Sequence, residues 1–301
     1  MNPRATEETP MSHPSRPLGV GHLTALGLAP PELVTTAAEA GFGFVGLRVL
    51  TGNGTERRWP VDVGSPMLLD TVRRMEDTGV SVLDVEIVAL KPGTAPADYE
   101  QALEVGVRLG ARFLNVMCDD PDLDRAADTF AGVVERARIY GIRPAIEPMA
   151  YKKVSSLSQA AGIARRSDGG GVLLDSLHLR RCGETLDDVR AVDPALLTYV
   201  QISDAPWQPP RLTRPAEPLP REQVCGDDPA QVESLTARLP AGDGELGLRE
   251  LLDVLPPDLA VSVEAPNLEL IESLGPHRFL RHHHDAARAL LHSGTPGLRS
   301  A

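Results

Sequence analysis

Short apolar runs alternate along this chain with longer segments whose apolar residues recur every three or four positions. The short runs are typical of buried strands, and the longer segments are typical of amphipathic helices. Eight strands are predicted, at residues 18–23, 44–49, 81–87, 113–117, 143–147, 171–175, 198–202 and 259–264. Helices are predicted at residues 30–40, 66–78, 97–109, 123–140, 156–165, 246–255 and 275–291, with a weaker one near 185–189.

This regular alternation predicts an α/β fold with parallel strands and right-handed crossovers. Eight units indicate a single-domain (β/α)8 TIM barrel, and an open doubly wound sheet is the structural alternative. Polar residues favour the barrel because they fall at strand ends, and the carboxyl-terminal rim of a barrel carries its active site. These residues are Arg48, Glu86, Asn115, Glu147, Asp175, Gln201 and Glu264.

The 301 residues suit one large barrel with additions. Residues 1–16 are rich in Pro, Glu, Thr and Ser, so we expect a disordered N-terminal tail there. The barrel is expected over residues 17–293, followed by a flexible tail at 294–301. The long segment 205–244 is expected to be a lid or an ordered loop over the site, since long connections in compact domains usually serve function.

Charge and composition limit the classes of binding partner that we expect. A net charge of -12 gives little attraction for a phosphate backbone, so no nucleic acid partner is expected. No apolar run predicts a membrane span, and the first residues lack the apolar core of a signal peptide. Three scattered cysteines predict neither a disulfide framework nor a zinc motif. We therefore expect a cytoplasmic protein that acts on a small molecule.

Four consecutive strand patterns end on side chains that carry oxygen, namely Glu147, Asp175, Gln201 and Glu264. A buried unpaired charge is unfavourable, so carboxylates at the ends of core strands need a partner. Oxygen ligands suit Mn²⁺ or Mg²⁺ better than a soft metal. We predict one such divalent ion on these four residues, although any one of them alone would more simply cap a helix or pair with a base.

Such a site would also bind a ketone and its neighbouring hydroxyl, as found in a polyol or keto substrate. The metal would stabilise the enolate that forms when an α-proton leaves. Glu147 and Glu264 are the predicted catalytic carboxylates, because each has a second oxygen to move a proton. His178, three residues after Asp175, is a third catalytic candidate.

Other polar residues have two interpretations each. Arg48, Glu86 and Arg238 either bind substrate or pair with one another and with nearby acids. The run at 282–284, three consecutive histidines, lies in the last predicted helix. Adjacent helix positions point in different directions, so we expect a solvated surface there and no compact site.

With these residues in view, the chain resembles the xylose isomerase-like TIM barrel superfamily, often described as sugar phosphate isomerases and epimerases. The resemblance spans about residues 18–270 and is specific only as a whole. It is carried by residues 28–34 and 37–48, by Asp84-Val-Glu86, by 109–116, by Ile146-Glu-Pro148, by 174–178 with Arg181 and Gly183, and by 200–205, 238–246 and Val263-Glu264.

The resemblance implies a metal on Glu147, Asp175, Gln201 and Glu264, proton transfer by the two glutamates and, since related barrels often form dimers, a homodimer. The third ligand is usually histidine in the sugar epimerases. Gln201 is instead similar to the branch that includes 3-dehydroshikimate dehydratases. The three lysines do not match the catalytic lysine of xylose isomerases, so no hydride shift is expected.

Three hypotheses follow. The first is a metal-dependent isomerase or epimerase of a sugar or polyol ketone. The second is a metal-dependent dehydratase of the 3-dehydroshikimate or inosose type, in which His178 would act as the acid and Arg48, Arg181 or Arg238 would bind a substrate carboxylate. The third is a non-catalytic barrel that binds no metal, since a fold alone does not fix a function.

Overall fold

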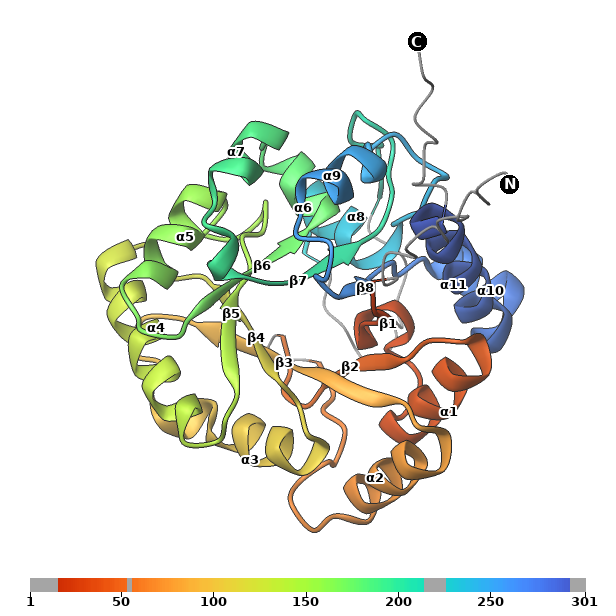
Figure 1. The fold of residues 1–301 in the computed structure, drawn as a ribbon, viewed down its shortest axis with the longest axis horizontal. Helices are drawn as coiled ribbons and strands as arrows, with labels where there is room; N and C mark the ends of the chain where they lie inside the picture. The colour runs from red at the N-terminus through yellow and green to blue at the C-terminus, as the bar shows by residue number, and fades with distance from the viewer. Residues whose placement is uncertain (1–15, 53–55, 214–225, 293–301) are drawn as a thin grey trace, which may run out of the picture.

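The computed structural model describes residues 16–52, 56–213 and 226–292. Its eight parallel strands close into a barrel in sequence order, with β8 paired to β1. Figure 1 shows the ring of strands with the helices outside it. The predicted barrel is confirmed, and the open sheet is wrong. The strands are β1 (Leu18–Val20), β2 (Phe44–Arg48), β3 (Ser81–Leu90), β4 (Phe113–Cys118), β5 (Arg143–Ile146), β6 (Gly171–Asp175), β7 (Leu197–Ile202) and β8 (Val261–Val263).

The helices largely follow the predicted spacing. They are α1 (Pro30–Ala40), α2 (Pro66–Thr78), α3 (Glu100–Leu109), α4 (Leu123–Arg138), α5 (Leu157–Arg165), α6 (Ser176–Arg181), α7 (Leu186–Ala191), α8 (Pro229–Thr236), α9 (Leu248–Val254), α10 (Leu268–Leu274) and α11 (Pro276–His292), with short 3₁₀ turns at His22–Ala25, Pro96–Asp98 and Pro194–Leu196. Helices α6, α8 and α10 were not predicted, because they are too short to show a clear helical period in the sequence. None of the helices in the described residues is long and apolar enough to cross a membrane.

Two apolar layers hold the barrel together. Aliphatic side chains fill the space between the strands and the outer helices. A second cluster fills the lumen at the amino-terminal end of the strands, and it consists of Phe44, Leu83, Phe113, Ala145, Leu173, Tyr199 and Ala260. Burying a large apolar side chain stabilises the fold by about 1.5–3 kcal/mol. This apolar layer closes the lumen below the carboxyl-terminal rim, where the polar strand ends lie.

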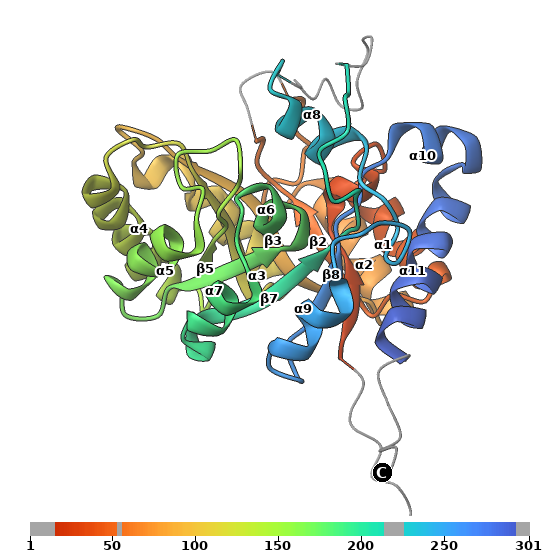
Figure 2. The ribbon, with the colours of Figure 1, turned by 90° about the horizontal axis from the view of Figure 1, so that it is seen from above.

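The segment 205–244 lies only in part within the described residues. Its described part contains α8, which Figure 2 shows lying over one end of the barrel. Backbone hydrogen bonds of 2.9 and 2.8 Å between Asp204 and Leu239 tie the two ends of the segment together. Residues 214–225 lie outside the described residues, as do the predicted tails up to residue 15 and beyond 293. Arg16, placed in the N-terminal tail by sequence, donates to the carbonyl of Leu252 at 2.8 Å.

The expectation of a solvated histidine run is wrong for two of its three residues. His282 is exposed, but His283 and His284 are only 1% and 5% exposed. Helix α11 packs against α1, and this contact covers the face that carries both rings. The His283 ring meets Phe279 edge to face at 4.5 Å, and the His284 ring meets Phe42 at 5.1 Å.

Candidate functional site

The four predicted ligands converge at the carboxyl-terminal rim. Asp175 ends β6 and Gln201 lies in β7, and the parallel register places them side by side. Glu147 follows β5 directly, and Glu264 follows β8 directly. All four residues are at most 4% exposed. The barrel therefore brings together residues that are up to 117 positions apart in the sequence.

The arrangement fits a divalent cation. Oxygen atoms of Glu147, Asp175 and Glu264 lie within 4.8 Å of one another. Gln201 Nε2 donates to Glu264 Oε1 at 2.8 Å, which leaves Gln201 Oε1 buried and without a hydrogen-bond partner. Glu147 Oε1 is buried as well and has no hydrogen-bond partner among the described residues. Buried oxygens of this kind need a donor or a metal, and all these atoms are hard ligands.

Arg238 is the cation that the structure itself supplies to this cluster. Its Nη1 donates to Asp175 Oδ2 at 2.5 Å and to the backbone oxygen of Glu264 at 3.0 Å, and its Nη2 lies 3.4 Å from Glu264 Oε2. The side chain is fully buried. One arginine against three carboxylates leaves the cluster negative. The predicted substrate-binding Arg238 does line the cavity, but these hydrogen bonds hold its guanidinium against the ligands.

The pKa values of the three carboxyl groups diverge. Burial, followed by repulsion from Glu264 and Asp175, raises the pKa of Glu147 well above its ordinary value. Burial also raises the pKa of Glu264, to about 8, against the opposing attraction of Arg238. Burial acts in the same direction on Asp175, but the Arg238 guanidinium outweighs it, and the pKa of Asp175 is lowered. Without a further cation, the two glutamates therefore favour protonation far more than the aspartate does.

His178 is positioned by Asp175. The Asp175 side chain caps α6 and accepts the backbone N–H of His178 at 2.9 Å, which fixes the histidine in the first turn. Its Nε2 lies 3.8 Å from Glu147 Oε1, and its ring meets Tyr151 edge to face at 5.4 Å. Burial lowers the pKa of His178 to about 4, so the imidazole is neutral at physiological pH. A neutral ring beside Glu147 can donate or accept one hydrogen bond.

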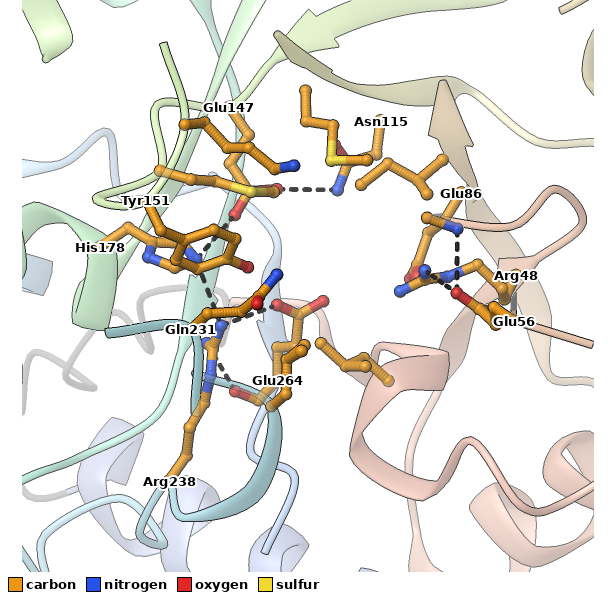
Figure 3. A pocket seen from close by; sticks show the side chains of 17 residues that line it. Arg48, Glu56, Glu86, Asn115, Glu147, Tyr151, His178, Gln231, Arg238 and Glu264 are labelled. Atoms are coloured by element: carbon orange, nitrogen blue, oxygen red, sulfur yellow. Dashed lines mark hydrogen bonds and ion pairs between the residues drawn. The ribbon is translucent and has the colours of Figure 1, made fainter. Parts of the chain in front are cut away.

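Figure 3 shows a second polar group across the cavity from Glu147 and Glu264. Arg48 Nε donates to Glu86 Oε2 at 3.1 Å, and its Nη1 lies 3.4 Å from Glu56 Oε2. Arg48 and Glu86 are therefore partners of each other, as one interpretation expected, and both line the cavity, so substrate binding by either residue stays a prediction. The cavity between the two groups measures about 90 Å³.

Arg181 does not reach this cavity. Its guanidinium forms two hydrogen bonds of 2.6 Å with the buried Glu233 of α8. A further bond of 2.9 Å goes to the carbonyl of Pro206. The side chain thus joins α6 to the segment that follows β7, and it fixes α8 over the site.

Several residues of the cavity wall were not singled out by sequence. Asn115 donates to Glu147 Oε2 at 3.0 Å, and only its place at a strand end was a signal. Glu56, Tyr151, Lys152 and Gln231 also line the cavity. They lie in loops or in the short helix α8, where no periodic pattern marks them.

Comparison with known proteins agrees with this architecture. The family model described as xylose isomerase-like TIM barrel matches residues 34–284. A crystal structure of the IolI protein with a bound zinc atom superposes with a TM-score of 0.71 at 16% identity, covering 93% of this chain and 99% of that one. A search of curated protein sequences found no match.

Two further solved structures show the same fold. A xylose isomerase domain-containing protein from Salmonella typhimurium LT2 has a TM-score of 0.68 at 15% identity and covers 91% of this chain and 97% of that one. A D-allulose 3-epimerase from Methylomonas sp. in complex with D-allulose has a TM-score of 0.62 at 12% identity and covers 92% and 96%. At these identities the likeness concerns the fold alone.

Proposed function

The chain belongs to the xylose isomerase-like TIM barrel family, and on this basis we propose that it is a divalent-metal-dependent isomerase or epimerase of a sugar or polyol ketone. The observation that carries the proposal is the buried cluster of Glu147, Asp175 and Glu264, with ligand atoms within 4.8 Å of one another at the open rim. Solved structures of D-allulose 3-epimerase and L-ribulose 3-epimerase share the fold, which supports the proposed reaction class.

Glu147, Asp175, Gln201 and Glu264 would hold the ion, with Mn²⁺ or Mg²⁺ as the expected metal; the IolI structure binds zinc. When bound, such an ion polarises a carbonyl and stabilises negative charge on its oxygen. The protein supplies the remaining steps. Glu147 would take the proton beside the ketone, giving an enediolate, and Glu264 would return a proton at the position that changes.

The surrounding residues would orient Glu147 and bind the hydroxyls of the substrate. Asn115 donates to Glu147 Oε2, which would orient this carboxylate toward the ion and the substrate. The neutral imidazole of His178 would bind a substrate hydroxyl beside Glu147. On the opposite wall, Arg48 and Glu86 would bind hydroxyls at the far end of the substrate. Gln231 and Leu235 of α8 also line the cavity, where they would limit the entry of water.

A metal-dependent dehydratase of the 3-dehydroshikimate or inosose type is the second candidate. It is favoured by Gln201 in the ligand set and by His178, which lies 3.8 Å from Glu147 and carries no fixed charge. Both reactions begin with removal of the same proton. They differ in whether a β-hydroxyl then leaves.

The deciding experiment is metal analysis of the purified protein combined with mass spectrometry of a ketone panel in D₂O. The panel contains ketohexoses, inosose and 3-dehydroshikimate. One metal per chain with deuterium incorporation supports the isomerase or epimerase, whereas loss of water supports the dehydratase. Absence of metal, with no effect of a chelator on stability, would refute both.

Glu147→Gln provides the matching variant, since it removes the proton acceptor and preserves shape. We expect turnover to be abolished while circular dichroism and the unfolding midpoint remain close to wild type. Glu135→Gln, at an exposed position on α4, controls for the lost charge. Near-normal turnover by Glu147→Gln would remove this residue from the mechanism.

A further inference from the structure

Three cationic side chains reach the wall of the cavity, and they are Arg48, Lys152 and Arg238. The two arginines are held by buried carboxylates. Arg48 lies between Glu56 and Glu86, and Arg238 between Asp175 and Glu264. Drawing either guanidinium toward a ligand would leave buried carboxylates without compensation, which is strongly unfavourable.

Lys152 has a different kind of partner. Its Nζ lies 2.5 Å from Asp119 Oδ2, and the lysine side chain is 13% exposed. The Asp119 side chain is 31% exposed and does not line the cavity. A partly exposed carboxylate keeps contact with water when its partner leaves, so breaking this ion pair costs less than leaving a buried carboxylate without its partner. Of the three cations, Lys152 is therefore the one that can exchange its partner without leaving a buried charge.

The backbone holds this lysine at the cavity wall. Met149 N–H donates to the carbonyl of Val154 at 3.0 Å, and Lys152 N–H donates to that of Met149 at 2.9 Å. Lys153 N–H donates to the carbonyl of Cys118 at the end of β4. The loop is thus fixed to the barrel. Only the flexible stem of Lys152 needs to rotate for its ammonium group to turn from Asp119 toward a ligand.

We propose that Lys152 determines specificity by binding an anionic substituent of the substrate, a carboxylate or a phosphate, in exchange for Asp119. The inference rests on the proposed function and deepens it, because it assigns the substrate to the anionic ketones. An ammonium group binds either kind of anion as a compact point charge. The two arginines would then keep their structural partners, and the sequence-based expectation that they bind a substrate carboxylate would not apply.

The test uses probe pairs that differ only in the anion, namely 3-dehydroshikimate with its methyl ester and D-fructose 6-phosphate with D-fructose. The readouts are deuterium exchange in D₂O and binding calorimetry. We expect Lys152→Met to lower the preference for the anionic member about tenfold or more, mainly through KM. Asp119→Asn should raise the same preference, because it removes the competing carboxylate. Lys153→Met, a neighbouring exposed lysine, serves as the matched control.

The two variants are expected to change the preference for the anionic probe in opposite directions, and this distinguishes a binding role of Lys152 from a structural one. If Lys152 only joined two loops, Lys152→Met and Asp119→Asn would have the same effect, and that result would overturn the proposal. An effect confined to one probe pair identifies the anion as a carboxylate or a phosphate. If no probe exchanges deuterium, the proposed function fails, but calorimetry still decides on Lys152. Equal binding of the anionic probes by wild type and Lys152→Met, or no binding by either, would refute the subsite.

Discussion

Replacing His283 by leucine should make the protein more resistant to acid. The ring is 1% exposed, and neither of its nitrogens has a hydrogen-bond partner among the described residues. Burial lowers the pKa of His283 to about 3, whereas the unfolded chain titrates near 6.5. Between these two pH values the unfolded state binds a proton that the folded state does not. Stability from this residue is therefore complete above pH 6.5 and is lost as the pH falls toward 3.

The size of the effect follows from the separation of the two pKa values. A pH of 5 is about 1.5 units below the pKa of histidine in the unfolded chain. Proton uptake by the unfolded state therefore favours unfolding by about 2 kcal/mol at this pH. Leucine removes this proton uptake. It also removes a buried N–H without an acceptor, a further gain of about 1–3 kcal/mol that does not depend on pH. We therefore expect His283→Leu to be more stable at pH 7, and to exceed wild type by a further 2 kcal/mol or so at pH 5.

Urea unfolding followed by circular dichroism at the two pH values measures both quantities. His282→Gln is the matched control, because the neighbouring ring is exposed. The reasoning fails if wild type and His283→Leu lose the same stability between pH 7 and pH 5. It also fails if His282→Gln reproduces the effect, since the buried ring would then not be the cause.

Two further predictions concern the metal cluster. Arg238→Met should destabilise the metal-free protein by about 3–5 kcal/mol, because buried Asp175 loses its partner. Urea unfolding should show a smaller loss with saturating Mn²⁺, and an equal loss with and without metal would argue against a cation site there. Gln201→Ala should weaken metal affinity about tenfold or more in calorimetry, a larger effect than its loss of stability in chelator, where only the hydrogen bond to Glu264 is removed. Unaltered affinity would exclude Gln201 as a ligand.

The convergence of the four oxygen-bearing side chains could be predicted because each of them marks a strand end. Glu147, Asp175, Gln201 and Glu264 each interrupt or close an apolar run, and parallel strands bring such ends to one rim. Only the order of the elements is needed to place these strand ends together. The order of the elements does not show which cations pair with the carboxylates, and so Arg238 was predicted as a substrate ligand although its closest partner is Asp175.

Other features depend on packing that no local pattern records. Arg181 was expected at the substrate, but its partner Glu233 lies 52 residues later in a helix too short to be recognised. His283 was expected in solvent because the pattern of α11 does not reveal that α1 covers this face. Lys152 lies in a loop, where neighbours are set by tertiary contacts such as that with Asp119.

The burial of Arg238 limits which segments of this barrel can change in sequence during evolution. Its guanidinium donates hydrogen bonds to Asp175, to Ser203 and to the carbonyls of Ser234 and Glu264. The segment after β7, which carries Arg238, therefore supplies positive charge that the buried carboxylates need. Insertions or exchanges there would disturb charge balance before they altered ligand choice. New specificities should therefore arise more readily by change in the loops after β2 and β5. The side chains that select a ligand and the side chains that hold Arg238 would then belong to different segments of one small cavity wall.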